Sequence, residues 1–360
     1  MKNFLKNQWF LLSLTVVLLT GFFLCESLQN LTELQFFRSA LLFIVMFLMA
    51  LPVRTAELGK ALRSPWAALY ASAINFILIP LLAWFSTGWF DRFLGEGMLI
   101  AAVVPCTLAS AAVWTRRAGG NDSVAIFVTL FTNLLCFLLT PFWIWVTLDQ
   151  STSISIPDLV GRLAGLVVLP MVLAQLCRQQ KALAAWATGR KTGLSVLAQI
   201  GILIMIMIGS AKMGLRLSAG EATFSWSEMA KVLLAVNAIH FSALFFGRWS
   251  ARLLGFGVRE QIAIGIAGSQ KTLMVGLNTA VELNRSILPM LLFHVCQLLF
   301  DTLIADRWKR EVPADDSAPI DQGPEKKNGV DANPHVSGDP STPKSPGSPG
   351  EDRSKTPGDS

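Results

Sequence analysis

The sequence predicts an all-α integral membrane protein of ten transmembrane helices, divided into two halves of five. Of the 360 residues, 52% are hydrophobic and only 15% are charged, whereas a soluble chain carries about 25% charged residues. The charges are clustered, and several apolar runs between them reach the length of about 20 residues that a helix needs to cross a bilayer. The fourth and ninth runs, at matching positions of the two halves, both contain helix-breaking residues, which predicts broken helices at these two positions.

Ten runs with few or no charges are the candidate helices. They cover about residues 7–25, 39–53, 64–90, 97–115, 123–148, 163–177, 192–211, 232–247, 261–281 and 286–300. With ten spans the loops alternate between the two sides, which places 17 Lys and Arg residues on one side and 7 on the other. Because basic loops stay in the cytoplasm, this asymmetry predicts that both termini are cytoplasmic.

The first run resembles a secretory signal peptide, because it is apolar and follows Lys2 and Lys6. The residues after it, FFLCES, are bulky where a signal peptidase requires small side chains. Removal of the run would also leave an odd number of spans. We therefore expect a retained first helix.

The chain changes character after residue 310. Residues 1–310 carry a net charge of +11, and residues 311–360 carry −5 and contain nine prolines with few large aliphatic side chains. Such a segment buries too little apolar surface to offset the entropy cost of ordering. The sequence thus predicts a ten-helix domain over 1–310 and a disordered cytoplasmic tail over 311–360.

Several classes of site are excluded by the sequence. The basic residues lie in short loops and form no single stripe, so a nucleic-acid partner is not expected. Neither a Walker A loop nor a glycine-rich dinucleotide turn occurs, and no two of the five cysteines have metal-ligand spacing. We expect no enzyme activity and no bound cofactor.

The most informative residue is Lys271, a charge in the middle of the ninth run, IAIGIAGSQKTLMVGLNTA. A lysine at the centre of a membrane helix costs about 2.5–3.5 kcal/mol, so it must face a partner or a watery cavity. Its polar or helix-loosening neighbours are Gly268, Ser269, Gln270 and Thr272. The run therefore predicts a broken helix that carries a binding site.

The fourth run is interrupted by Pro105, followed by Thr107 and Ser110. A proline removes a backbone donor and frees nearby carbonyl groups, which must find other partners inside a membrane. Interrupted helices at matching positions of two halves indicate a transporter site that holds ions and substrate. A single Ser or Thr in a membrane helix more often serves close packing, so the prediction depends on the combination.

Other polar residues lie within the remaining spans. They are Thr129 and Asn133 in the fifth, Gln199 in the seventh, Asn237 and His240 in the eighth, and His294 and Gln297 in the tenth. The histidines could relay protons, although a histidine bonded between helices is commoner. Asp301 and Asp306 are expected to be solvated at the cytoplasmic end of the last span.

Two stretches resemble a known family. PCTLASAAVWTRRAGGNDSVAIFVTLFTNLLCFLLTP, residues 105–141, is similar to the bile acid:sodium symporter family, and IAGSQKTLMVGL, residues 266–277, resembles its SBF-like branch, of the CPA type. The resemblance implies ten helices in two inverted repeats of five, with helices four and nine crossing at the ion site between a panel domain and a core domain. It also implies sodium-coupled uptake of organic anions, with Gln270 and Thr129 at positions of the family's sodium ligands.

The chain departs from this family pattern at the ion site. The family's ion-binding glutamate corresponds here to Ile266, and its Ser/Asn pair falls near Ala111 and Ala112. Lys271 replaces a neutral residue, and its fixed ammonium would repel a sodium ion. Our hypothesis is that Lys271 either replaces the cation permanently and attracts an anionic substrate, or loses its proton during the cycle.

The leading interpretation is a secondary transporter of a small organic anion, such as a bile acid or another carboxylate or sulfonate, in a bacterial cytoplasmic membrane. Alternatives are a proton-coupled exchanger, which would need an acid in mid-span, and a non-transporting receptor or scaffold that acts through its tail. An intramembrane hydrolase would pair Ser269 with Lys271, but residues two apart on a helix point to different sides. Oligomeric state and substrate identity are not predicted.

Overall fold

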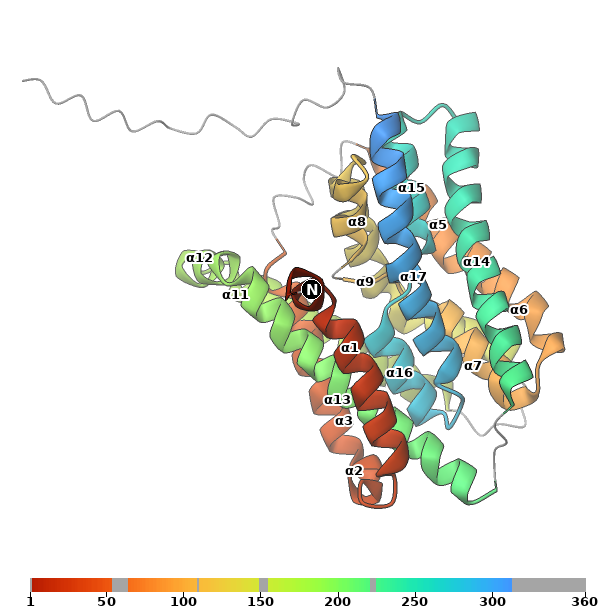
Figure 1. The fold of residues 1–360 in the computed structure, drawn as a ribbon. Coiled ribbons are helices and arrows are strands. Elements are labelled where there is room, and N and C mark those ends of the chain that lie inside the picture. The colour runs from red at the N-terminus through yellow and green to blue at the C-terminus, as the bar shows by residue number, and fades with distance from the viewer. Residues whose placement is uncertain (1, 54–63, 109, 149–154, 221–224, 313–360) are drawn as a thin grey trace, which may run out of the picture. The chain divides into compact units, whose positions relative to one another are not determined.

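The computed structural model describes residues 2–53, 64–108, 110–148, 155–220 and 225–312, and is helical throughout (Figure 1). No β-strand occurs in these ranges, which confirms the all-α prediction. The side chains of residues 2–9 and 11 lie outside the description. Residues 313–360, nearly all of the predicted tail, lie outside the described residues as well.

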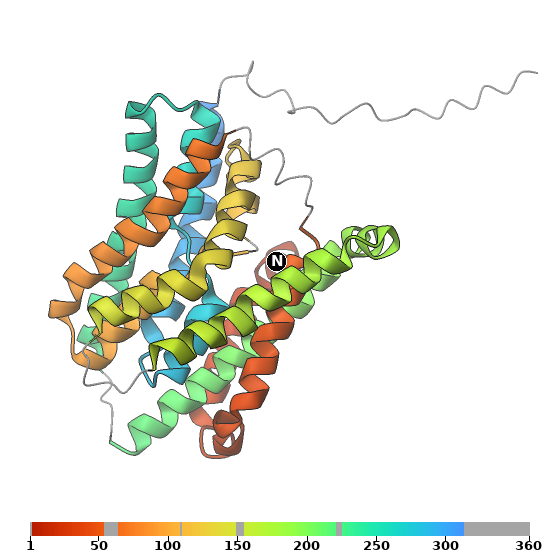
Figure 2. The same cartoon turned by 180° about the vertical axis from the view of Figure 1, so that it is seen from behind.

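One group of helices packs along the chain's N-terminal helix. Its main members are α1 (Lys2–Phe23), α3 (Gln35–Ala50), α11 (Leu169–Cys177) and α13 (Lys191–Ser218), and α2 (Gln29–Glu33) and α12 (Lys181–Gly189) also belong to it. These helices lie side by side in both views (Figures 1 and 2). Gly21 and Gly214 let α1 and α13 touch, because a Cβ atom at Gly21 would lie 2.5 Å from the carbonyl oxygen of Met207.

A second group packs around α15. It consists of α5 (Pro65–Ala73), the π-helix η1 (Ile74–Leu78), α6 (Ile79–Ser86), η2 (Thr87–Trp89), α7 (Arg92–Val103), α8 (Ala111–Arg117), α9 (Asp122–Thr147), α14 (Trp226–Leu253), α15 (Val258–Ser269), α17 (Leu288–Trp308) and η4 (Lys309–Glu311). Three elements join the groups. They are α16 (Leu273–Glu282), which contacts α3, α13, α7 and α17, and α10 (Ile156–Leu163) with η3 (Ala164–Val168), which contact α9.

Six described helices are long and apolar enough to cross a membrane, and the chain is an integral membrane protein. They cover Pro65–Trp89, Asp122–Thr147, Ile156–Cys177, Lys191–Ser218, Trp226–Leu253 and Leu288–Glu311. This number does not reach the ten expected from the sequence. The other four runs contain two shorter apolar helices, Leu12–Phe23 and Gln35–Ala50, and two helices that are interrupted, α7–α8 and α15–α16.

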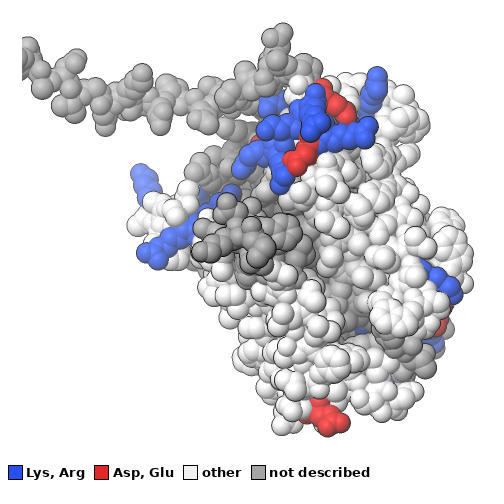
Figure 3. Space-filling model, in the orientation of Figure 1, with Lys and Arg blue, Asp and Glu red and all other residues white. Residues whose placement is uncertain are grey.

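Charged side chains gather at one end of the helices, where the C-terminal ends of α8 and α17 lie (Figure 3). Arg117 pairs there with Asp306 at 2.7 Å, and Arg248 with Glu311 at 2.5 Å. Below this cluster, the face seen in Figure 3 is largely uncharged. Exposed apolar side chains on several helices, such as Phe85 and Trp249, fit contact with lipid.

Pro80 shapes the helix of residues 65–89. Proline has no backbone N–H, so carbonyl groups in the preceding turn lose their partner. The turn before it is the π-helix η1, in which Ile79 N–H bonds to Ile74 rather than to Asn75. Trp143 Nε1 donates to the released carbonyl of Phe76 at 2.7 Å. The carbonyl of Asn75 is released in the same way and becomes available to another helix.

Both the fourth and the ninth run lose helical geometry in their middle. Helix α7 ends at Val103, Val104 is extended with ψ 158°, and α8 begins only at Ala111. Pro105 lies directly in this break, as its missing donor requires. Helix α15 ends at Ser269, Gln270 is extended with ψ 145°, and α16 begins at Leu273. Gly268, which the sequence predicted to lie at the break, remains within α15, one residue before the helix ends at Ser269.

Candidate functional site

The two helix breaks contact each other directly. The backbone N–H of Thr272 donates to the carbonyl of Pro105 at 2.9 Å. The ammonium of Lys271 donates to the carbonyl of Val104, also at 2.9 Å. Two segments separated by more than 160 residues are therefore paired through backbone groups that a continuous helix would use internally.

Side chains of α9 bind the backbone of the first break. Four polar backbone groups between residues 103 and 107 have a partner on this helix: Thr140 donates to Val103 O (2.8 Å), Thr132 accepts from Cys106 N (3.1 Å), Asn133 donates to Cys106 O (2.8 Å) and Thr129 donates to Thr107 O (3.2 Å). Because an unpaired backbone group is costly in a membrane, these residues fix the shape of the break.

The second break is held from two other helices. Asn75 Nδ2 donates to the carbonyls of Gly268 and Gln270 at 3.2 and 2.8 Å. Gln297 of α17 bonds both backbone groups of Lys271, accepting from its N–H and donating to its carbonyl, each at 2.9 Å. The amide of Gln297 thus replaces the hydrogen bonds that a helix would have supplied.

Lys271 is completely buried, and its ammonium lies against oxygen atoms. It donates to Asn75 O at 2.7 Å, to Asn75 Oδ1 at 3.0 Å and to Val104 O at 2.9 Å. Its Nζ also lies 5.8 Å from the ring centre of Phe76. Among the described residues, no carboxylate forms an ion pair with it. The oxygens released by Pro80 and by the first break therefore surround the terminal nitrogen of Lys271.

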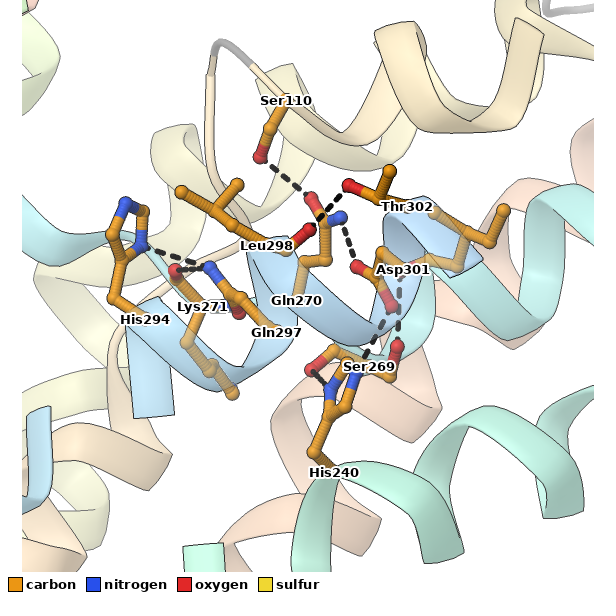
Figure 4. A network of polar contacts seen from close by, with 11 residues as sticks. Ser110, His240, Ser269, Gln270, Lys271, His294, Gln297, Leu298, Asp301 and Thr302 are labelled. Carbon is orange, nitrogen blue, oxygen red and sulfur yellow. Dashed lines mark hydrogen bonds and ion pairs between the residues drawn. The ribbon is translucent and has the colours of Figure 1, made fainter. Parts of the chain in front are cut away.

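Gln270 links the first break to α17 (Figure 4). Ser110 Oγ donates to its Oε1 at 2.9 Å, and its Nε2 donates to Asp301 Oδ2 at 2.5 Å. Asp301 Oδ1 lies 3.0 Å from His240 Nε2 of α14, and His240 Nδ1 lies 3.3 Å from the carbonyl oxygen of Ser269. This chain of contacts runs through four elements and ends at the last residue of α15.

The burial of Asp301 corrects a prediction. The sequence placed Asp301 and Asp306 in solvent beyond the end of the last span, but α17 continues to Trp308 and Asp301 has no exposed surface. Asp306 is exposed and pairs with Arg117. The expectation that Asp301 is solvated was therefore wrong, and one acid lies inside a span. The spacing of His294, Gln297 and Asp301 along one face of the helix is the signal that could have revealed it.

The predicted site residues lie in two neighbouring sets. Ser110, Ser269, Gln270, Lys271 and Thr272 belong to the second break and its partners, and Thr107, Thr129 and Asn133 belong to the first break. No hydrogen bond among the described contacts joins Gln270 to Thr129, the pair expected to bind sodium. Sequence reasoning missed Asn75 and Thr132. An Asn within the apolar run before Pro80 was the available signal for the former.

One buried oxygen near the first break has no partner among the described contacts. Asn133 is completely buried, and its Nδ2 donates to Cys106 O and Thr129 O, but its Oδ1 accepts no hydrogen bond. An oxygen of this kind suits a hard cation such as sodium. No group of three His, Cys, Asp or Glu side chains in the described ranges is arranged to hold a metal ion.

A cavity of about 150 Å³ lies between the two helix groups. Leu48 and Met49 of α3 line it from one side, and Ala112 and Val113 of α8 from the other. Its remaining lining residues are Pro52, Val53, Leu108, Arg116, Ile126, Lys191 and Ser195. The walls are mainly apolar and carry two basic side chains, and Leu108 brings the cavity to the first break.

Comparison with known proteins gives a consistent result. The sequence model of the SBF-like CPA transporter family matches residues 8–310. The probable sodium/metabolite cotransporter BASS4 of chloroplasts from Oryza sativa is 26% identical over 286 residues, which are 74% of this chain and 68% of that protein. The putative symporter YfeH of Escherichia coli is 26% identical over 256 residues (68% and 75%), and the sodium/bile acid cotransporter 7 of Danio rerio is 23% identical over 273 residues (72% and 80%).

Proposed function

Because the chain belongs to the SBF-like CPA transporter family, we propose that it is a secondary transporter that moves a small organic anion across the membrane by alternating access, coupled to sodium. The family consists of transporters, and the names of the relatives point to sodium and to metabolites or bile acids as cargo. The observation that carries the proposal is the paired crossing, in which two broken helices hold a buried ammonium between them.

The proposed architecture has ten membrane helices in two inverted repeats of five. The interrupted helices α7–α8 and α15–α16 occupy the fourth and ninth positions of this order. The two packing groups correspond to a panel of α1, α3, α11 and α13 and a core around α15. In the transport cycle the panel and the core move against each other, so that the crossing opens to one side at a time.

An anionic substrate is favoured by charge. When protonated, Lys271 supplies a positive charge at the crossing, and Arg116 and Lys191 add two more at the cavity between the helix groups. The cavity has apolar walls, which suits a carboxylate or sulfonate with a hydrocarbon body. Its volume of about 150 Å³ corresponds to roughly ten water molecules, so in this conformation it fits a small anion better than a whole steroid.

Sodium is assigned to the first break rather than to Gln270. Both polar atoms of the Gln270 amide already have partners, and the oxygens around Asn75 are taken by the ammonium of Lys271. Asn133 Oδ1 is buried and unpartnered among the described contacts, and the hydroxyl of Thr129 lies on the same face of α9. These neutral oxygens are the proposed ligands, and the neighbouring Lys271 charge lowers their affinity for sodium.

The proposed location is a bacterial cytoplasmic membrane with both termini in the cytoplasm. The excess of basic residues on one side of the predicted spans supports this orientation. Lipid surrounds the helices, and the predicted tail of residues 311–360 has no role in transport. Removal of residues 313–360 should then leave uptake unchanged, whereas a receptor or scaffold that acts through the tail would lose its function.

The proposal is tested by measuring anion uptake into proteoliposomes in which the full chain is reconstituted. Labelled cholate, taurocholate and short-chain carboxylates are the probes, and an inward sodium gradient drives the uptake. We expect uptake of at least one anion by the natural sequence and its loss in Lys271→Gln. The matched control is Lys231→Gln, which changes an exposed lysine of α14 paired with Glu228. Normal uptake by Lys271→Gln would refute the role given to this residue.

A further inference from the structure

Helix α12 has no role in the transport scheme described above. None of its residues, Lys181–Gly189, lines the cavity between the helix groups. Both views place the helix at the end of α11, beside the first helix group (Figures 1 and 2). Its residues are therefore available for another interaction.

The chain on both sides of α12 holds it at the membrane surface. It follows α11, the end of a helix long enough to cross a membrane, and it precedes α13, which is another such helix. Residues 178–180 connect it to α11, and only Arg190 separates it from α13. An extended chain spans at most about 3.6 Å per residue, so links of this length keep α12 beside the lipid headgroups.

The apolar side of α12 is largely uncovered. Only Ala187 is buried, and Leu183 and Trp186, which share a helix face with it, are 36% and 45% exposed. Lys181 and Thr188 lie on the opposite face. A short amphipathic helix with an exposed indole is typical of a helix that lies in the plane of the membrane interface, where tryptophan is enriched.

The charge of this segment has a single sign. Four basic residues lie in or next to α12, and they are Arg178, Lys181, Arg190 and Lys191. No Asp or Glu occurs in residues 159–220, and Figure 3 shows Lys and Arg but no acidic side chain on the visible face of this helix. Arg178 donates to the carbonyl of Leu51 at 2.9 Å, and the guanidinium of Arg190 lies 5.7 Å from the ring centre of Trp186. Among the residues that the structure describes, none of the four basic side chains forms an ion pair.

We propose that α12 is a binding surface for anionic phospholipid. Leu183 and Trp186 enter the interface, and Lys181 and Arg190 bind the phosphates of the headgroups, for which ammonium and guanidinium groups are both suited. The side of the membrane on which α12 lies by the proposed orientation is the cytoplasmic one, whose leaflet carries the anionic lipid. The inference requires only the membrane location of the chain and does not depend on the proposed transport.

The test measures lipid binding to the full chain in a neutral detergent. The probes are phosphatidylglycerol and phosphatidylcholine with the same acyl chains, and native mass spectrometry gives the dissociation constant of each. We expect the natural sequence to bind phosphatidylglycerol more tightly, and we expect high salt to reduce this preference, because exposed charges are screened. Equal binding of the two lipids would overturn the proposal.

Two double variants locate the binding surface. A basic residue near an anionic lipid surface contributes about fivefold in affinity, so Lys181→Gln combined with Arg190→Gln should weaken binding of phosphatidylglycerol by about 30-fold. The matched control is Arg252→Gln combined with Arg307→Gln, which removes two exposed basic side chains near the ends of α14 and α17, on the same side in the proposed orientation. The control should keep the preference, and an equal loss in both double variants would overturn the proposal.

Inorganic phosphate distinguishes a lipid surface from a site for a free anion. Phosphate at the same concentration as the lipid should not displace phosphatidylglycerol, because it lacks the acyl chains that the apolar face of α12 contacts. Displacement by phosphate would overturn the assignment to lipid. Failure to find anion uptake, with the lipid preference intact, would instead refute the transport function and leave this surface standing.

Discussion

Gln297 offers the clearest test of how the second break is maintained. Its amide bonds both the N–H and the carbonyl of Lys271 at 2.9 Å, and it is completely buried. Gln297→Leu keeps a similar side-chain volume but leaves both backbone groups without a partner. Each buried unsatisfied group costs about 1–3 kcal/mol, so the variant should lose about 2–6 kcal/mol of stability.

The assay is thermal unfolding of the purified chain in detergent. At about 2 °C per kcal/mol for a chain of this size, Gln297→Leu should unfold about 4–12 °C below the natural sequence. Gln261→Leu is the matched control, because Gln261 is also buried but makes one hydrogen bond, to Phe256, outside the break. A loss in Gln297→Leu no larger than in Gln261→Leu would refute the reasoning.

Two further predictions concern packing and surface charge. Gly97→Ala should destabilise the chain by about 1–3 kcal/mol, because a Cβ atom there would lie 2.4 Å from the carbonyl oxygen of Ser286. Gly88→Ala is the control and should not destabilise the chain, because no atom lies within 4 Å of its Cβ. Equal unfolding temperatures of the two variants would contradict the prediction. Asp306→Asn at a fixed pH should change the unfolding temperature by less than about 3 °C, because exposed ion pairs contribute at most about 1 kcal/mol; a larger loss would show that the pair with Arg117 is structural.

Much of the crossing could be predicted from the sequence because its cause is local. Pro105 cannot continue a helix, and a lysine in mid-membrane needs polar surroundings, so the two interrupted runs and the importance of Lys271 follow from single residues. Thr129 and Asn133 of α9 were also visible as polar positions in an apolar run. What each of them bonds depends on which backbone groups the break releases.

The partners across the crossing could not be predicted, because they come from distant parts of the chain. Asn75 meets Lys271 only because a π-helix before Pro80 releases a carbonyl towards the second break. Asp301 was predicted to be in solvent, because a charge near the end of an apolar run usually marks the membrane boundary. That inference holds only if the helix ends there. Helix α17 runs on to Trp308, so the same residue becomes a buried group.

We propose that the first of the two paired breaks holds the sodium ion of a transporter. The most direct measurement is the unfolding temperature of the full chain in high sodium, potassium or choline at equal ionic strength. A site-bound ion at about 100 times its dissociation constant stabilises by about 2.7 kcal/mol. We expect a sodium-specific rise that disappears in Thr129→Val and persists in Thr140→Val. The second variant is the control, because the buried hydroxyl of Thr140 also donates from α9 to the first break, at Val103 O. Equal unfolding temperatures in the three salts, or an unchanged sodium effect in Thr129→Val, would contradict it.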